Sequence, residues 1–313
     1  PDISRRQRQM CIRDSIWMEG IGLIGLGANA KAASIAGDLV VQNARVRAIG
    51  EDAGGFRPIS EKDLFDCEYW SLEQAKLGKG APPKFQGKVV MITGGSGTIG
   101  FAIAEAFSKL GAQTILVDKD EIALKESVAK LGVGHKYFPI DVTHSDAANQ
   151  AMLAAINNFG GLDILISNAG AAHAGPMLGI SNEELRNAFE LNFFSHYSFS
   201  TEAAKILKDQ NRGGQILFNI SKQAVNPGKN FGAYGLPKAT TFFLMRQLAL
   251  ELGSDAIRVN GINADRIRSG LLTDDFISAR AKSRGVSESE YMAGNRLNKE
   301  VTAEHVADAF TAL

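Results

Sequence analysis

Two residues near the start of a predicted helix could carry acid–base chemistry together. Tyr234 and Lys238 stand four residues apart, so their side chains share one face of a helix. Pro237 between them is tolerated only in the first turn, which places both residues near the helix N-terminus. Because an ammonium group favours the phenolate, Lys238 is expected to lower the pKa of Tyr234 from about 10. The pair could then take a proton from an alcohol or give one to a carbonyl.

Ser221 and Asn192 could complete this constellation. Ser221 comes thirteen residues before Tyr234, at the end of an expected strand, where its hydroxyl could hydrogen-bond the same reacting oxygen. Asn192, inside an expected helix over residues 182–208, could hold a water that relays protons outward. Any of these residues alone could be an ordinary surface or capping residue. The catalytic hypothesis therefore depends on their combination with a cofactor site.

A glycine-rich turn supplies that cofactor site. The apolar run Val89–Ile92 predicts a buried strand, and Phe101–Leu110 has apolar residues at helical spacing. Strand, glycine turn and helix form the context in which a dinucleotide binds, because glycines admit the pyrophosphate and free N–H groups at the helix start face it. We assign these contacts to the residues of the turn: Gly94, Ser96, Gly97, Thr98, Ile99 and Gly100.

The carboxylate of Asp118 predicts which cofactor binds. Asp118 ends the next apolar run, Thr114–Val117, at the position where this kind of fold hydrogen-bonds the adenosine ribose. Its negative charge would repel a 2′-phosphate, so we predict NAD as the cofactor, with NADP disfavoured. The adjacent Lys119 weakens that preference.

The chain from residue 85 onward alternates strands with helices. Further strands are expected at 135–140, 162–166, 215–220 and 258–263, with helices at 145–159, 182–208 and 232–252. This alternation predicts an α/β fold, a Rossmann-type, doubly wound parallel sheet flanked by helices. Ligands of such sheets lie beyond the carboxyl ends of the strands, where Asp118, Asp141, Asn168 and Ser221 all fall.

Composition excludes several classes of function. The 313 residues carry equal numbers of acidic and basic side chains and no basic block, which argues against nucleic-acid or membrane-surface partners. The two cysteines, Cys11 and Cys67, exclude a disulfide scaffold and fit a reducing environment. Because of this cysteine usage we expect a cytoplasmic protein, and no apolar run is long enough to span a membrane.

The histidines show no spacing typical of metal ligands, so no metal site is predicted. His173, in the loop after Asn168-Ala169-Gly170, could touch a substrate. The others, His135, His144, His196 and His305, are interpreted as structural or solvated.

Residues 85–313 resemble the short-chain dehydrogenase/reductase family. The resemblance is carried by Thr93-Gly94 with Gly97 and Gly100, Asp141-Val142, Asn168-Ala169-Gly170, Asn192, Ser221 and Tyr234-x-x-x-Lys238. It implies that Tyr234 is the general acid/base, that Lys238 tunes it and holds the nicotinamide ribose, and that Ser221 orients the substrate oxygen. Asn192 would support the proton relay. Further cofactor contacts are implied at Asp141, Val142, Asn168, Ala169, Gly170, Ile267 and Ser269.

The same resemblance implies a small alcohol or carbonyl substrate and a homo-oligomer, but the chain departs from the family pattern. The usual turn T-G-x-x-x-G-x-G has Thr98 in its sixth place here. Ala264-Asp265 replaces the usual Pro-Gly, which puts Asp265 near the nicotinamide, while Ser269 keeps the expected hydroxyl. The family's seventh strand is absent before Leu313, so we interpret the domain as C-terminally truncated, with an exposed sheet edge.

The segment before residue 85 is interpreted in three parts. Residues 1–15 fit no periodicity and are interpreted as a non-native leader, with a disordered basic arm as the alternative. Residues 16–50 contain a second G-x-G-x-x-G at Gly20–Gly25, expected to be a turn into a helix over 30–48 rather than a nucleotide site. Residues 51–84 are interpreted as a linker, whose aromatic segment Asp66–Leu77 is expected to dock on a neighbouring domain.

Residues 16–84 also resemble the junction in bacterial fusions of a class II aldolase with a short-chain dehydrogenase. The resemblance is carried by Gly22–Ala48, by Phe65-x-x-Glu68-Tyr69-Trp70-x-Leu72-Glu73-x-Ala75-Lys76-Leu77 and by Asn295–Val301. The best-known members join a rhamnulose-1-phosphate aldolase to a lactaldehyde dehydrogenase, which implies an aldolase domain in the parent chain, rhamnose catabolism and a small hydroxy-aldehyde or sugar-derived substrate. The first histidine here is His135, so the aldolase's histidine zinc ligands are missing.

Three functions follow from these patterns. The main hypothesis is an NAD-dependent oxidoreductase that interconverts an alcohol and a carbonyl. The alternatives are a nucleotide-binding sensor and a structural partner module of the fused aldolase. The intact Ser221, Tyr234 and Lys238 favour the oxidoreductase.

Overall fold

The computed structural model describes residues 14–68, 81–172 and 174–313. The chain divides into two compact units, Pro1–Gly87 and Lys88–Leu313. The division lies beside residue 85, where the larger domain was expected to begin. Each unit is described by itself.

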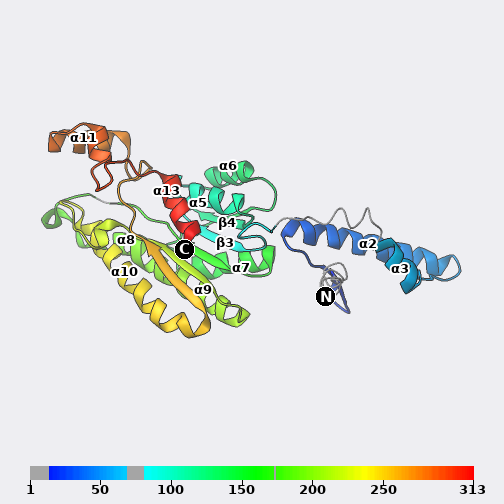
Figure 1. Cartoon of the computed structure of the whole chain (residues 1–313). Coiled ribbons are helices and arrows are strands. Elements are labelled where there is room, and N and C mark those ends of the chain that lie inside the picture. Colours follow the sequence, from blue (N-terminus) through cyan, green and yellow to red (C-terminus); the bar gives the residue numbers. More distant parts are fainter. Residues whose placement is uncertain (1–13, 69–80, 173) are drawn as a thin grey trace. The chain divides into compact units, whose positions relative to one another are not determined.

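The larger unit is built on a parallel sheet with the strand order β5-β4-β3-β6-β7-β8 (Figure 1). Its strands are β3 (Val89–Thr93), β4 (Gln113–Asp118), β5 (Lys136–Pro139), β6 (Ile164–Ser167), β7 (Gly214–Asn219) and β8 (Ile257–Ile262). The central strand β3 pairs with both β4 and β6, with Val90 opposite Thr114 on one side and Ile164 on the other. The chain therefore reverses its direction across the sheet between β3 and β6, which is where ligands of doubly wound folds bind.

Helices cover both faces of this sheet, so the predicted Rossmann-type fold class is confirmed (Figure 1). One layer contains α5 (Thr98–Lys109), α6 (Glu121–Leu131) and α13 (Ala303–Ala312), and the other contains α7 (Ala147–Phe159), α9 (Ser195–Gln210) and α10 (Gly232–Leu252). Two short helices, α11 (Asp274–Arg284) and α12 (Glu288–Met292), pack on each other through a small apolar cluster of their own.

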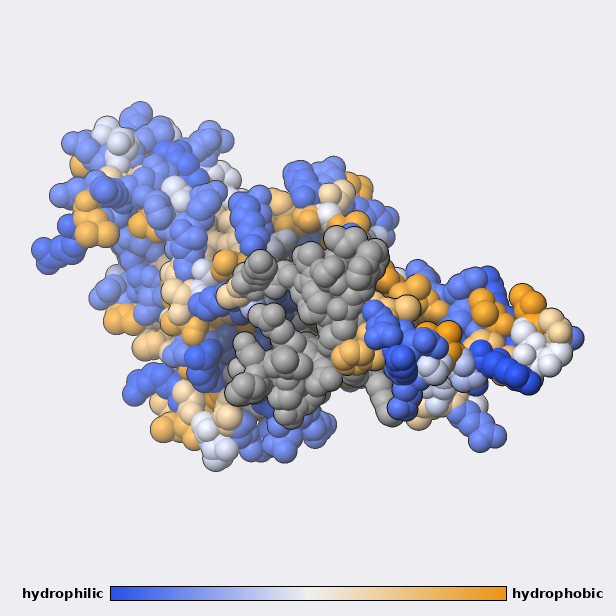
Figure 2. Space-filling view, turned by 45° about the vertical axis from the view of Figure 1, so that its right-hand side comes forward, coloured by the Kyte–Doolittle hydropathy of each residue, from blue (hydrophilic) through white to orange (hydrophobic). Residues whose placement is uncertain are grey.

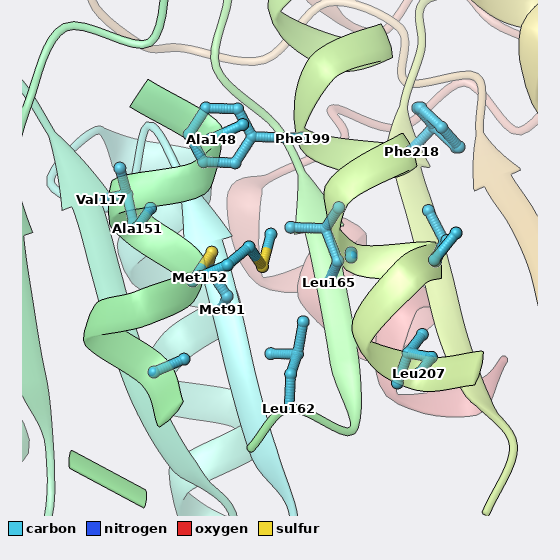
Figure 3. Close-up of a cluster of buried hydrophobic side chains, with 14 of the residues drawn as sticks. Met91, Val117, Ala148, Ala151, Met152, Leu162, Leu165, Phe199, Leu207 and Phe218 are labelled. Atoms are coloured by element: carbon cyan, nitrogen blue, oxygen red, sulfur yellow. The ribbon is translucent and has the colours of Figure 1, made fainter. Parts of the chain in front are cut away.

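The main core lies between the sheet and the α7–α9 layer (Figure 3). Met91 of β3, Leu165 of β6 and Phe218 of β7 are completely buried there against Phe199 and Leu207 of α9. All five residues of β3 are buried, which explains why the strand is a continuous apolar run rather than an alternating one. This packing fixes the carboxyl ends of the strands, where the predicted site residues lie.

The prediction of one continuous helix over residues 182–208 is wrong in its continuity. The structure divides it into α8 (Asn182–Phe189), a π-helical turn at Glu190–Phe194, and α9. A π-helical turn inserts one extra residue per turn, which re-aims side chains and often marks functional sites. Asn192 is at the centre of this turn.

The smaller unit corrects the interpretation of the second glycine motif. Gly20 and Ile21 lie in a turn as expected, but Gly22–Gly25 is strand β2, which pairs antiparallel with β1 (Ser15–Met18) in a hairpin. A hairpin offers no helix N-terminus to a pyrophosphate, so the motif is not in a nucleotide-binding context. Gly25 of the motif allows close packing instead, because a Cβ there would lie 2.4 Å from the carbonyl oxygen of Ala33 on the next helix.

That helix, α2 (Ala30–Asp52), confirms the predicted helix and continues two residues into the expected linker. A further helix, α3 (Glu61–Glu68), also lies inside the range 51–84. Ile35, Leu39 and Ile49 of α2 are at least half exposed, and hydrophobic side chains are visible on the surface of this unit (Figure 2). Most of the segment Asp66–Leu77, and residues 1–13 of the predicted leader, lie outside the described residues.

Candidate functional site

A cavity of about 390 Å³ opens at the carboxyl ends of the strands. The structure brings nearly all of the predicted site residues to its wall. These are Gly94, Gly97, Thr98, Ile99, Gly100, Asp118, Asp141, Val142, Asn168, Ala169, Gly170, Ser221, Tyr234, Lys238, Ile267 and Ser269. Two predicted residues do not line it: Ser96 turns its side chain to Asp118, and Asn192 is buried behind the wall.

The glycine turn connects β3 to α5 at one end of the cavity. Gly94 has a φ of +65°, which side chains rarely adopt. A Cβ on Gly100 would lie 2.1 Å from the carbonyl oxygen of Gly94, so the turn closes only with glycine at this position. Gly97 caps α5 without a side-chain hydrogen bond, which leaves the first N–H groups of the helix for an anion.

Asn168 joins the glycine turn to the opposite wall of the cavity. Its side-chain amide donates to the carbonyl oxygens of Thr93 at 3.0 Å and Gly94 at 3.3 Å. Its Oδ1 accepts a hydrogen bond from Asn219 Nδ2 at 2.8 Å. The carbonyl oxygen of Asn219 in turn accepts from Lys238 Nζ at 3.2 Å. A continuous network therefore sets the distance between the turn and Lys238.

Tyr234 and Lys238 are both buried, with 9% and 2% of their surfaces exposed. Pro237 lies in the second turn of α10 rather than the first, so the helix forgoes one backbone hydrogen bond next to this pair. Lys238 Nζ lies 5.8 Å from the centre of the Tyr234 ring, and both side chains face the cavity.

The prediction that Lys238 lowers the pKa of Tyr234 is wrong. Burial raises the pKa of Tyr234, and a hydrogen bond with the Ser221 hydroxyl opposes the rise. Burial also lowers the pKa of Lys238, to about 7. Near neutral pH, Lys238 is therefore present both as the ammonium and as the neutral amine. Among the described residues it is therefore Ser221 that favours the phenolate.

Asn192 is completely buried in the π-helical turn. Its Nδ2 donates to the carbonyl oxygens of Ala171 at 2.9 Å and Ala188 at 3.1 Å, whereas its Oδ1 has no hydrogen-bond partner among the described residues. A Cβ on Gly170 would lie 2.9 Å from that Oδ1 and 3.4 Å from Lys238 Nζ. The glycine thus keeps open the space between Asn192 and Lys238.

The loop after β8 closes another side of the cavity. Asp265, which replaces the family's usual glycine, lines the cavity and forms an ion pair with Lys222. The backbone N–H of Lys222 also donates to the carbonyl oxygen of Ala264 at 3.1 Å. Since Lys222 directly follows Ser221, this contact ties the Ser221 loop to the loop after β8. The pairing was not predicted, because nothing in the spacing of the two residues indicates it.

The contact of His196 with the site was not predicted either. His196 is completely buried on α9 and contacts Lys238 Nζ through its Nε2 at 3.2 Å, so of the two interpretations, structural or solvated, the structural one holds. Its position four residues after Asn192 places it on the same helical face, which is the signal that could have found it. His173, predicted to touch a substrate, lies outside the described residues.

Residues 14–68, 81–172 and 174–313 contain no cluster of three or more His, Cys, Asp or Glu side chains arranged to hold a metal ion. None of their helices combines the length and the apolar character needed to cross a membrane.

Comparison with known proteins places these features in a family. Residues 88–276 match the short chain dehydrogenase family, and residues 9–77 match the second domain of class II aldolases. The chain is 31% identical over 307 residues to the uncharacterized oxidoreductase YuxG of Bacillus subtilis, covering 94% of this chain but only 44% of that protein. It is 31% identical over 180 residues to galactitol 2-dehydrogenase of Agrobacterium fabrum, covering 57% of this chain and 70% of that enzyme.

The fold is shared with solved structures as well. A 3-ketoacyl-(acyl-carrier-protein) reductase from Brucella melitensis, crystallised with NADH, superposes with a TM-score of 0.66 at 24% identity, over 72% of this chain and 89% of that one. At that identity the likeness concerns the fold alone. The parallel sheet, the glycine turn and the match over residues 88–276 together show that this chain belongs to the short-chain dehydrogenase family of oxidoreductases.

Proposed function

We propose that this protein is an NAD-dependent oxidoreductase that interconverts an alcohol and a carbonyl. The observation that carries the proposal is the arrangement of one cavity, with the glycine turn and Asp118 at one end and Ser221, Tyr234 and Lys238 at the other. Such a cavity can hold a dinucleotide along its length and a small substrate beside the phenol. Bound NAD would supply hydride transfer, and the protein would position both reactants and move the proton.

In this proposal the residues of the wall have separate roles. Free N–H groups at the start of α5 face the pyrophosphate, and Asp118 accepts hydrogen bonds from the adenosine ribose. Lys238 donates to the nicotinamide ribose. Contacts along the cofactor are assigned to the remaining wall residues of the predicted set, which are Asp141, Val142, Asn168, Ala169, Gly170, Ile267 and Ser269.

Tyr234 transfers the proton. During oxidation its phenolate takes the proton of the alcohol, and during reduction its neutral hydroxyl gives one to the carbonyl oxygen. The hydroxyl of Ser221 holds that same oxygen and favours the phenolate. Asn192, whose Oδ1 lies behind the wall with no partner in the described part of the chain, is proposed to hold the water through which the proton leaves.

We further propose a small hydroxy-aldehyde or a sugar-derived alcohol as the substrate. The likeness to a galactitol dehydrogenase and the match of residues 9–77 to a class II aldolase domain support this class. The same match supports the assignment of residues 16–50 to an aldolase-like domain, with a rhamnulose-1-phosphate aldolase/lactaldehyde dehydrogenase fusion as one candidate parent. A homo-oligomer is proposed on the family resemblance.

A combined binding and turnover experiment tests this function. NADH and NADPH are titrated by cofactor fluorescence, and sugar alcohols and short aldehydes are then screened for changes in NADH absorbance, with Tyr234→Phe as the control. Binding with turnover that the control lacks supports the oxidoreductase. Binding without any turnover would favour a nucleotide sensor, and the absence of both would favour a structural module of the aldolase.

A further inference from the structure

Lys238 is held from its inner side by a histidine that the proposed mechanism does not use. His196, on α9, places its Nε2 3.2 Å from Lys238 Nζ, and the carbonyl oxygen of Asn219 lies at 3.2 Å from the same nitrogen. An ammonium group has three N–H bonds to donate. Two of them are taken by these inner partners, which leaves one for a group in the cavity that Lys238 lines.

His196 is in turn fixed by a residue at the end of β6. Its Nδ1 lies 2.6 Å from Ser167 Oγ, and both residues are buried, with 0% and 1% of their surfaces exposed. Burial and the nearby charge of Lys238 hold the pKa of His196 well below its usual range, and a hydrogen bond with the Ala169 backbone only partly opposes them, so the ring is neutral. A neutral imidazole carries one proton, on either Nδ1 or Nε2.

The partners decide which nitrogen carries that proton. An ammonium group can only donate, so Nε2 must be the acceptor whenever Lys238 is charged. The proton then resides on Nδ1, which donates to Ser167 Oγ. While Lys238 is charged, these contacts are consistent only with Nδ1 as the donor and Nε2 as the acceptor, so the lone pair of Nε2 points at the ammonium.

We propose that His196 is a positioning residue that keeps Lys238 charged and aimed at the cavity through its Nε2, while Ser167 Oγ accepts the hydrogen bond that Nδ1 donates. This inference rests on the proposed function, in which Lys238 contacts the cofactor. The titratable groups that face Lys238 are Tyr234 on its own helix and His196 on α9. β7 faces it with the carbonyl of Asn219, and the loop after β6 faces it with Gly170.

The tautomer of His196 can be measured without any turnover. Long-range ¹H–¹⁵N spectra of the ring are recorded at about pH 6, below the pKa of about 7 of Lys238. The proposal expects a protonated Nδ1 and an unprotonated Nε2 whose signal moves in Lys238→Met. A wild-type protein with its ring proton on Nε2, or an Nε2 signal unchanged in Lys238→Met, would overturn it.

Kinetics test what the contact does for Lys238. His196→Leu removes the acceptor but keeps an apolar volume beside Phe218, whose ring centre lies 6.2 Å from that of His196. His196→Gln keeps an acceptor, and Ser167→Ala removes only the partner of Nδ1. Losing an acceptor makes the buried ammonium easier to discharge, so the basic limb of the pH profile of kcat/KM should move down by about one unit in His196→Leu. It should return toward wild type in His196→Gln and shift by less in Ser167→Ala.

A packing role alone gives a different result. His196→Leu and His196→Gln would then lose activity by the same factor at every pH, in proportion to their lower melting temperatures, and this outcome would refute the proposal. Failure of the proposed function is distinguishable from failure of this inference. If the wild type shows no turnover, the kinetic test gives no result, but the tautomer measurement still decides whether His196 accepts from Lys238.

Discussion

Ser96 and Asp118 form a hydrogen-bonded clasp between the glycine turn and the end of β4. Ser96 Oγ donates to Asp118 Oδ2 at 2.7 Å, and the backbone N–H of Ser96 donates to the same oxygen at 3.3 Å. The other oxygen, Oδ1, accepts from the backbone N–H of Lys119 at 2.8 Å. The carboxylate that is proposed to select the cofactor thus also holds the turn in place.

Asp118→Ala is expected to narrow the preference for NAD over NADP. The change removes both an acceptor for the ribose hydroxyls and a charge that repels a 2′-phosphate. Since hydrogen bonds to charged groups contribute about 1.5–3 kcal/mol, the ratio of kcat/KM values for the two cofactors should fall by about tenfold or more. Ser96→Ala is the matched control, because it opens the clasp but keeps the charge. A wild type that already prefers NADP would refute the role of Asp118.

Gly97 and Gly100 should respond differently to the same substitution. A Cβ on Gly100 would meet the carbonyl oxygen of Gly94 at 2.1 Å, whereas one on Gly97 would meet that oxygen at 3.4 Å, an ordinary contact. Gly100→Ala should therefore destabilise the fold, by about 1–3 kcal/mol or more. Gly97→Ala should melt near the wild-type temperature but lose about tenfold or more in NADH affinity, because its methyl group faces the cavity.

Thermal melts and NADH fluorescence on both variants check this pair. Unchanged NADH affinity in Gly97→Ala would mean that the pyrophosphate does not lie against the turn. A Gly100→Ala protein as stable as the wild type would mean that the turn can relax, which the contact with Gly94 contradicts.

Lys238→Met is expected to raise stability while it abolishes turnover. The pKa of Lys238 is about 7 in the folded protein, against 10.5 for an ordinary lysine. The unfolded chain therefore binds more protons between these values, so the wild type gains stability as pH rises from 7 to 10.5 and is penalised below this window. A methionine side chain has no charge to desolvate. The melting temperature of Lys238→Met should therefore exceed that of the wild type by about 3 °C or more at neutral pH.

The pH dependence separates this effect from a general gain in packing. The difference in melting temperature between Lys238→Met and wild type should shrink as pH approaches 10. A constant difference across the range, or a less stable variant at neutral pH, would show that burial does not destabilise the charge of Lys238.

The sheet and the wall of the cavity were predictable because they depend on local signals. Buried strands such as β3 are apolar runs, and parallel strands place their carboxyl ends at one edge, so Asp118, Asn168 and Ser221 had to meet. The glycine turn was predictable for the same reason, since it directly links β3 to α5.

The features that were missed depend on burial and on contacts between distant segments. His196 meets Lys238 across 42 positions of sequence, so its spacing from Asn192 indicates a shared helical face but not the contact with Lys238. The π-helical turn around Asn192 interrupts a stretch whose sequence shows continuous helical spacing, so it was predicted as one helix. The direction of the pKa change of Tyr234 was wrong because sequence gives proximity to Lys238 but not the desolvation of both groups.

Tyr234→Phe tests the assignment of the proton carrier. The change keeps the buried ring and removes its hydroxyl, so NADH affinity should stay near wild type. General acid/base groups contribute about 10²–10⁴-fold, and kcat should fall by that order. Full turnover in this variant on an established substrate would mean that the proton moves through another group, and the catalytic assignment would have to be withdrawn.

Ser221→Ala gives the companion result, and here the pH profile matters more than the rate. The hydroxyl of Ser221 opposes the rise that burial causes in the pKa of Tyr234, so its loss should raise that pKa further. Oxidation of an alcohol needs the phenolate, hence the acid limb of kcat should move to higher pH in Ser221→Ala. Reduction of a carbonyl needs the neutral phenol, so it should keep more of its activity than oxidation does at the same alkaline pH. Measuring both directions across pH checks the prediction, and a uniform loss in the two directions with an unmoved acid limb would contradict it.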